Sequence, residues 1–298
     1  MKDILTIVIR LTVSCLLAAT VMGICLIFTS NAKKHNEHVK EQRVMYSLLG
    51  YKGDVTIPDS LAMHEIYRYV LTGPSKQSIA YLVPQGHGEG KGFLFVNINL
   101  DGQIIESKQI PLTEAQALES ESRNKAMQEA AETGYEAQFA DKTFVVTDNG
   151  QRIAYLLGGK FQGFKTFIDV MVAVEPNFSL IGFEVLEHEE DPGLGAEIEQ
   201  DYFKNQFKGK PFVALKEIDV VKAPIPEEYL KALNGKISEE DILKIREQYK
   251  DGDIYALTGA TISTRAVANG VKGIVRKFAY RVEVLDKVLT EQQLAVSF

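Results

Sequence analysis

The sequence predicts an α+β protein that a single apolar helix anchors to a membrane. Three observations support this fold class: an uncharged apolar run near the N-terminus, apolar strand patterns separated by turn residues, and helical patterns that do not alternate regularly with the strands. The chain has 298 residues, of which 45% are hydrophobic and 24% charged, so it holds enough apolar material for a folded core.

Charge and cysteine content limit the classes of function. With 33 basic and 40 acidic residues the formal net charge is −7, whereas a general nucleic-acid binder needs a basic surface. Cys15 and Cys25 cannot form a disulfide framework or close a zinc site, and five scattered histidines do not supply one. We therefore expect no metal centre and no nucleic-acid partner.

The N-terminal run is long enough to cross a bilayer. No charged residue occurs from Leu11 to Ser30, and a helix over this run is about 30 Å long, which matches the hydrocarbon core. We predict a transmembrane anchor over residues 1–30, in contact with membrane lipid, and a polar helical stalk over residues 31–50. A cleaved signal peptide is the alternative, because Ser30-Asn31-Ala32 resembles a cleavage site.

The charges around the anchor do not determine its orientation. Basic residues stand on both sides of the run, with more of them after it. Counted simply, they would keep the soluble part in the cytoplasm, but long domains cross membranes largely regardless of nearby charge. The sequence alone leaves the side of the membrane open.

The first part of the soluble region is predicted to form strands followed by a helix. Asp101-Gly102 is a hairpin-turn signal between two apolar runs. Thr113 and Gln116 match a capping box, and Gly134 ends the helix that they start. These signals predict strands over residues 79–83, 92–100 and 103–110, and a helix over residues 113–134.

A second strand-rich block, residues 143–188, leads to the C-terminal helices. Its similarity to the first block is too short to establish an internal repeat. We predict a hairpin of strands 167–174 and 180–186 around Pro176-Asn177, and two short helices between residues 224 and 251, the second capped by Ser238. Apolar residues recur at helical spacing over residues 262–278, which predicts an amphipathic helix there.

The glycine-rich loop over residues 86–92 is a weak candidate for phosphate binding. It lacks the P-loop spacing and the Ser or Thr after the lysine, and a strand follows it instead of a helix. We interpret it as the entry to a hairpin.

Two further stretches are stronger candidates for a site. Residues 188–191 carry four ionisable side chains in a row, which point to alternate sides of an extended segment and cannot converge on one ion. Residues 192–195 follow them as a stiff corner that lets backbone amides approach a flat ligand. Residues 258–264 crowd three threonines and a serine at a helix start, which favours either an anion site or simple N-capping.

The sequence of residues 258–264 resembles a known flavinylation motif. Thr258-Gly259-Ala260-Thr261, followed by Ile262-Ser263-Thr264, is similar to the [S/T]-G-A-T-x-[S/T] motif of the FMN-binding domain family. That family includes the G subunit of the Rnf complex and the C subunit of the sodium-pumping NADH:quinone reductase. The run 187–195 is similar to the family's H-x-E-T-P-G-L-G signature, and residues 203–210 continue it. Tyr255 stands where the family usually carries Asp, and Asp191 replaces the usual Thr.

The resemblance implies a domain organisation and a cofactor. It places an FMN-binding domain over residues 151–280, after a family-atypical segment over residues 51–150 and before a C-terminal tail over residues 281–298. FMN would be covalently linked by a phosphoester to Thr261. The cofactor-binding residues that it implies are Thr258, Gly259, Ala260, Thr261, Ser263, Thr264, His188, Glu190, Pro192, Gly193, Leu194 and Gly195.

The resemblance also implies a function. The chain would be the electron-transfer subunit of an ion-translocating ferredoxin:NAD oxidoreductase of the Rnf type, with no substrate site or catalytic residue of its own. Its partners would be other membrane and iron–sulfur subunits, and a flavin transferase for maturation. The family places the soluble domain on the outer, periplasmic side of the cytoplasmic (inner) membrane. The alternatives are the C subunit of the NADH:quinone reductase and a non-catalytic anchored scaffold.

Overall fold

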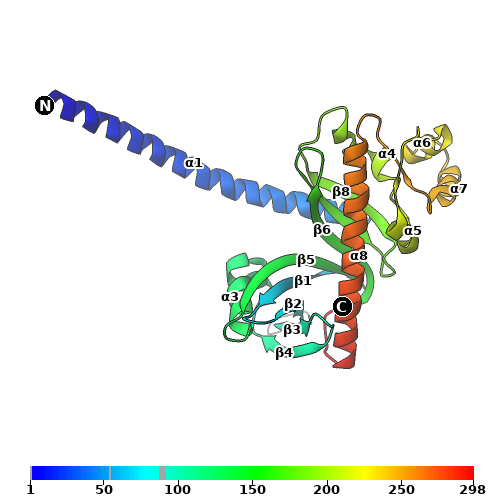
Figure 1. Cartoon of the computed structure of the whole chain (residues 1–298), viewed down its shortest axis with the longest axis horizontal. Coiled ribbons are helices and arrows are strands. Elements are labelled where there is room, and N and C mark those ends of the chain that lie inside the picture. The colour runs from blue at the N-terminus through cyan, green and yellow to red at the C-terminus, as the bar shows by residue number, and fades with distance from the viewer. Residues whose placement is uncertain (1, 54, 87–91) are drawn as a thin grey trace. The chain divides into compact units, whose positions relative to one another are not determined.

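The computed structural model describes residues 2–53, 55–86 and 92–298, which Figure 1 draws as ribbons. Most of the glycine-rich loop, residues 87–91, lies outside the described residues. By their internal contacts, the residues form two units, 1–47 and 48–298, and each is described by itself.

Helix α1 (Lys2–Leu48) combines the predicted anchor and stalk in one continuous helix. Its segment Thr6–Leu26 has a mean hydropathy of 2.1 over 21 residues and is long enough to span a membrane. Thr12 and Thr20 donate their hydroxyls to the carbonyls four residues earlier, at 2.9 and 2.8 Å. These bonds satisfy polar groups within an apolar helix, as a bilayer requires.

The second unit contains an eight-stranded sheet in the order β4-β3-β2-β1-β5-β6-β7-β8, in which all neighbours are antiparallel. Its strands are β1 (Leu61–Thr72), β2 (Gln77–Pro84), β3 (Phe93–Asn99), β4 (Ile104–Ile110), β5 (Glu136–Asp148), β6 (Gln151–Gln162), β7 (Phe167–Val174) and β8 (Leu180–Glu187). Each half is a four-stranded meander, and the halves meet where β1 pairs with β5. The two blocks of the sequence therefore share one topology.

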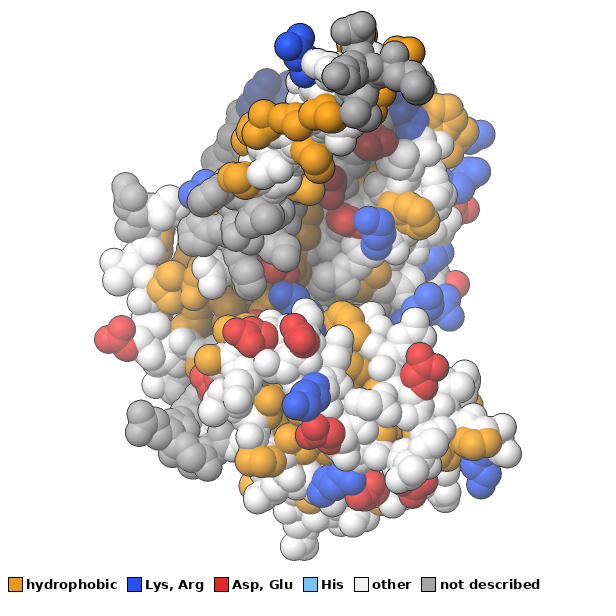
Figure 2. Space-filling view, turned by 90° about the vertical axis from the view of Figure 1, so that its left-hand side faces the viewer, with side chains coloured by type: hydrophobic (Ala, Val, Ile, Leu, Met, Phe, Trp, Pro, Cys, Tyr) orange, Lys and Arg blue, Asp and Glu red, His pale blue; other side chains and the backbone are white. Residues whose placement is uncertain are grey.

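The remaining elements lie outside the eight-stranded sheet. They are α2 (Glu114–Leu118), α3 (Ser120–Ala130), η1 (Gly195–Glu199), α4 (Asp201–Lys204), α5 (Phe212–Glu217), β9 (Val220–Val221), α6 (Glu227–Leu233), α7 (Glu239–Tyr249), β10 (Ile254–Tyr255) and α8 (Thr261–Glu291). Two of them, β9 and β10, pair in a separate sheet. The α+β class with antiparallel strands and flanking helices is confirmed. On the face shown in Figure 2, acidic and basic side chains are interspersed.

The prediction of a single helix over residues 113–134 is wrong in one respect, because the structure has two helices there. The capping box at Thr113 forms and starts α2, but the backbone turns extended at Glu119, with φ −79° and ψ 118°. The Arg123 guanidinium donates to the carbonyls of Ala117 at 2.6 Å and Leu118 at 3.4 Å. These bonds satisfy carbonyls that α2 leaves without a helical partner at its end, just before the second helix begins.

The strands alternate their side chains between two cores. In β2, Tyr81 and Val83 join a core that includes Val271 and Val275 of α8, whereas Leu82 joins a second core with Met127 of α3. The period of two along a strand accounts for this division. Helix α8 thus covers one face of the sheet, and α2 and α3 cover part of the other.

Helix α8 runs well beyond the predicted end at residue 278 and lies along both halves of the sheet (Figure 1). Its C-terminal half is held by ion pairs, Arg281 to Asp141 at 2.9 Å and Arg152 to Asp286 at 2.7 Å. Burial tends to raise the pKa of Asp141, but the guanidinium groups of Arg68 and Arg281 outweigh it and hold that pKa below its ordinary value.

Glycines let α8 approach β6 closely. A Cβ added at Gly270 would lie 2.2 Å from the ring of Phe161, and one added at Gly159 would lie 2.2 Å from Cδ1 of Ile274. The helix and the strand therefore interlock through one small residue on each side. By contrast, a Cβ at Gly273 would meet nothing within 4 Å.

These contacts predict opposite effects for two glycine substitutions in the same helix. Gly270→Ala should lower the free energy of unfolding by about 1–3 kcal/mol, because the Phe161 ring must move. Gly273→Ala, the matched control, should raise it by about 0.5–1 kcal/mol through helix propensity. Thermal unfolding of the detergent-solubilised chain measures both. Equal effects of the two substitutions would contradict the close approach.

Candidate functional site

The N-terminus of α8 has no side-chain cap. Its N-cap is Ala260, with φ −131° and ψ 40°, and no side chain bonds to the first N–H groups there. The alternative that a Ser or Thr of this segment simply caps the helix is therefore wrong. The first turn of a 31-residue helix begins at Thr261 with its positive dipole end uncapped.

The four hydroxyls of the segment differ in accessibility. Thr264 is fully buried, accepts a bond from the Leu257 N–H at 3.1 Å and donates to the Ala260 carbonyl at 3.0 Å. Ser263 is 3% exposed and donates to the Glu190 carboxylate. Thr258 is exposed and Thr261 is partly exposed. Only the last two offer a hydroxyl that a modifying enzyme could reach.

Glu190 links three parts of the chain. Its side chain is 4% exposed, and Oε1 accepts bonds from the N–H groups of Phe164 at 2.8 Å and Lys165 at 3.1 Å. Oε2 accepts the Ser263 hydroxyl. All three partners donate, so both oxygens of the carboxylate act as acceptors. The β6–β7 turn, the segment after β8 and the start of α8 meet at this group.

Two glycines make room for this carboxylate. A Cβ at Gly195 would lie 2.7 Å from Glu190 Oε2 and 2.8 Å from the Ser263 hydroxyl oxygen. A Cβ at Gly163 would lie 2.5 Å from Glu190 Oε1. Any side chain at either position would displace the carboxylate. The site residues that the sequence implied include Gly195 but not Gly163.

The four ionisable residues 188–191 have different partners and exposures, as expected for an extended segment. His188 Nδ1 accepts the N–H of Glu190 at 3.0 Å, and its Nε2 lies 3.2 Å from Glu199 Oε1. Glu189 is exposed, and Asp191 pairs with Lys165. Within the described residues, no three His, Cys, Asp or Glu side chains are grouped to hold a metal.

The corner over residues 192–195 lies against the threonine segment. Gly193 has φ +72°, and the exposed Leu194 reaches across to Gly259, where an added Cβ would lie 2.9 Å from Leu194 Cδ2. Phe164 and Ile262 are also large apolar residues that remain exposed. The structure thus brings together the two motifs that lie far apart in the sequence, with exposed apolar residues in both segments and in the adjoining turn.

Two buried polar residues that the sequence analysis did not name support this segment. Gln206 accepts the N–H of Tyr255 at 2.8 Å and donates to its carbonyl at 3.3 Å. Lys210 donates to the carbonyls of Tyr249 at 3.2 Å, Lys250 at 3.1 Å and Gly252, and burial lowers its pKa to about 8. Both fix the backbone that leads into residue 258. The signal for them was their position in the family-like run 203–210.

Tyr255 has a packing role where the family usually carries Asp. Its ring centroid lies 6.2 Å from that of Tyr229 and 6.4 Å from that of Tyr249, and those two rings stack at 4.0 Å. The nearest acid, Asp253, accepts the N–H of Asp219 at 2.9 Å. Tyr255, the residue that departs from the motif, therefore belongs to an aromatic cluster.

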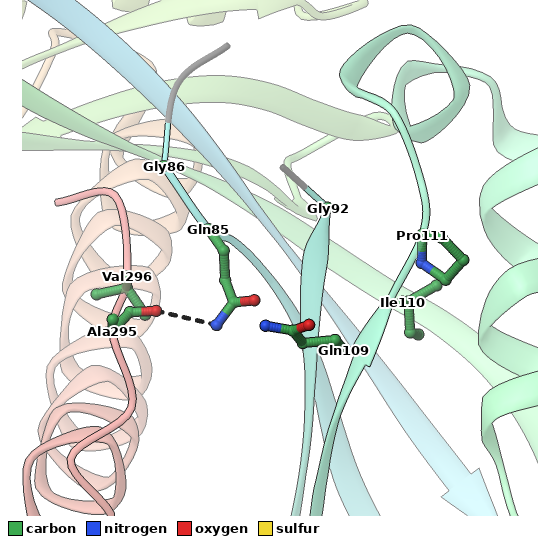
Figure 3. Close-up of a pocket in the computed structure, with 8 residues that line it drawn as sticks. All are labelled: Gln85, Gly86, Gly92, Gln109, Ile110, Pro111, Ala295 and Val296. Carbon is green, nitrogen blue, oxygen red and sulfur yellow. Dashed lines mark hydrogen bonds between the residues drawn. The ribbon is translucent and has the colours of Figure 1, made fainter. Parts of the chain in front are cut away.

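A separate cavity of about 740 Å³ lies in the other half of the sheet (Figure 3). Its described lining is Gln85, Gly86, Gly92, Gln109, Ile110, Pro111, Ala295 and Val296. Gln85 Nε2 donates to the Ala295 carbonyl at 3.1 Å across it. The cavity contains none of the predicted site residues.

Residues 163–276 match the family model of the FMN-binding domain, a range that contains both motifs and Glu190. The chain carries an FMN-binding domain. The resemblance to this family is thereby confirmed, and the residues at the meeting point of the two motifs are the candidates for holding FMN.

Curated relatives bear out the resemblance to the G subunit. The chain is 31% identical over 143 residues to the G subunit of the proton-translocating ferredoxin:NAD(+) oxidoreductase complex of Clostridium ljungdahlii, covering 48% of this chain and 58% of that protein. It is 25% identical over 183 residues to the G subunit of the ion-translocating oxidoreductase complex of Pasteurella multocida, covering 60% and 79%. The chain thus spans a little over half the length of the clostridial relative.

A solved structure resembles the chain at a lower level. The crystal structure of Shewanella oneidensis NqrC covers 78% of this chain and 90% of its own, with 19% identity and a TM-score of 0.41.

The hydrogen bonds of Glu190 predict a local change in backbone protection. Glu190→Ala removes the acceptor of the Phe164 and Lys165 amides, and bonds to charged groups are worth about 1.5–3 kcal/mol. Their hydrogen exchange should accelerate about tenfold or more. Glu189→Ala, at the exposed neighbour, should leave it unchanged. Hydrogen-exchange mass spectrometry of the peptide containing residues 164 and 165 measures this change. Unaltered protection in Glu190→Ala would contradict the assigned bonds.

Proposed function

We propose that this protein is a membrane-anchored electron carrier that holds FMN through a phosphoester bond to Thr261. It would serve as a subunit of an ion-translocating ferredoxin:NAD oxidoreductase of the Rnf type. The FMN-binding domain, the apolar segment of α1 and the G-subunit relatives support this proposal. The names of those relatives also favour it over the C subunit of the NADH:quinone reductase.

The observation that carries the attachment is the accessibility of one hydroxyl at an uncapped helix start. A phosphoester at Thr261 would place its negative charge at the positive end of α8, an interaction worth about 0.3–1 kcal/mol. Ser263 and Thr264 are buried and engaged in internal bonds. Thr258 is exposed but lies before the helix begins, and its hydroxyl is the main competitor.

The residues around Thr261 have distinct tasks in this proposal. Bound through its phosphate, FMN supplies one- and two-electron chemistry while its ring keeps its redox positions free. Glu190 joins the β6–β7 turn to the helix start, and Leu194 and Phe164 offer exposed apolar surface at which water is displaced. No substrate pocket is required, since the electron donor and acceptor are other redox centres.

The proposal extends to partners and location. The carrier would work beside other membrane and iron–sulfur subunits, with α1 in contact with lipid and the soluble domain on the periplasmic side of the inner membrane. A flavin transferase would have to reach Thr261 from solvent, and its partial exposure supports this access.

Substitution of the two accessible threonines tests the attachment. Thr261→Val keeps the shape of the side chain and removes the hydroxyl, so it should abolish covalent flavin. Thr258→Val, the matched control three residues earlier, should retain it. In-gel flavin fluorescence after denaturation, together with the intact mass of chains purified from their native cells, gives both results.

Two results would contradict the proposal. Covalent flavin that persists in Thr261→Val and disappears in Thr258→Val would move the attachment to the other threonine. A colourless wild-type protein without added mass would remove the electron-carrier function altogether.

A further inference from the structure

The start of α8 carries a buried negative charge that the proposed attachment does not use. Glu190 is 4% exposed and is held by two backbone N–H groups and the Ser263 hydroxyl. Each of these partners is neutral, so none of them cancels the charge of the carboxylate. Ser263 lies only two residues after Thr261, in the first turn of the same helix.

The charged groups around Glu190 leave an excess of negative charge. The β6–β7 turn carries a cation, Lys165, which is 45% exposed and pairs with Asp191, and which also interacts electrostatically with Glu190 and Glu189. On α8, Arg265 is exposed to solvent. Charges of exposed groups are screened by water and salt, whereas that of Glu190 is not.

We propose that Glu190 lowers the reduction potential of the flavin held at this site, which makes the flavin a stronger electron donor. This inference rests on the proposed function. Electron uptake adds negative charge to the flavin, and a fixed anion near it makes that uptake less favourable.

The geometry separates this electrical role from the positioning role of the same side chain. In Glu190→Gln the amide oxygen can still accept the Phe164 and Lys165 N–H groups, and its NH2 can donate to the Ser263 oxygen. The substitution therefore removes the charge and keeps the connections between the three segments. Glu189 differs from Glu190 by one position and by its exposure, so Glu189→Gln is the matched control.

The test is a redox titration of the full chain carrying its native flavin, followed by flavin absorbance. Glu190→Gln should raise the midpoint potential so that, at a fixed applied potential, the ratio of reduced to oxidised flavin increases about tenfold. That ratio corresponds to about 30 mV for a two-electron couple. Glu189→Gln should change the ratio less than about twofold, because its charge is screened.

A second variant, Glu190→Asp, keeps the negative charge and shortens the side chain. If Glu190 acts through its charge, the ratio of reduced to oxidised flavin in this variant should stay within about twofold of the wild-type ratio. A purely structural role predicts a shifted potential, because the shorter side chain cannot make the same hydrogen bonds. If Glu190→Gln fails to fold, this comparison decides the question.

The outcomes separate the inference from the function on which it rests. A coloured wild type whose potential does not rise in Glu190→Gln, or rises equally in Glu189→Gln, overturns the role of Glu190 alone. A potential that shifts in Glu190→Asp also overturns it. A wild type without flavin overturns both this inference and the proposed function.

Discussion

The carboxylate of Glu190 is the group on which the geometry of the candidate site depends. A buried charge is costly unless hydrogen-bond donors surround it, and here the donors come from two other segments, the turn at Phe164 and Lys165 and the helix start at Ser263. Satisfying the carboxylate therefore requires these segments to meet. Gly195 lies so close to the carboxylate that no side chain fits there, which gives a steric reason for a glycine at that position.

The helix start can meet this requirement because α8 is fixed along its whole length. The close approach at Gly270 sets the distance between the helix and β6, and the ion pair of Arg281 with Asp141 holds the helix further along its length. A helix of 31 residues that is packed at several points has little freedom at its first turn. The position of Thr261 is thus determined by contacts that lie far from it in the sequence.

The sequence predicted those features that local patterns encode. The hairpin of β7 and β8, the capping box at Thr113 and the two motifs all depend on neighbouring residues, and the structure contains each of them. The central strand β1 escaped prediction, because Arg68 interrupts its apolar pattern and is accommodated only by Asp141 on the adjacent strand. The burial of Glu190 and Lys210 could not be inferred from local composition either, because their hydrogen-bond partners come from distant segments.

The two halves of the sheet show why only one of them carries the FMN-binding motifs. Both are four-stranded meanders, and in each half the connection between the second and third strands lies near the end of the fourth strand. In the first half the cavity lined by Gln85 and Gln109 lies there, with the C-terminal residues Ala295 and Val296 beside it. In the second half the start of α8 occupies the corresponding place and brings an uncapped helix terminus with a partly exposed threonine, Thr261. The strands provide the same framework twice. The two halves differ in the later segment of the chain that packs against each of them, and this segment determines which functional groups each half carries.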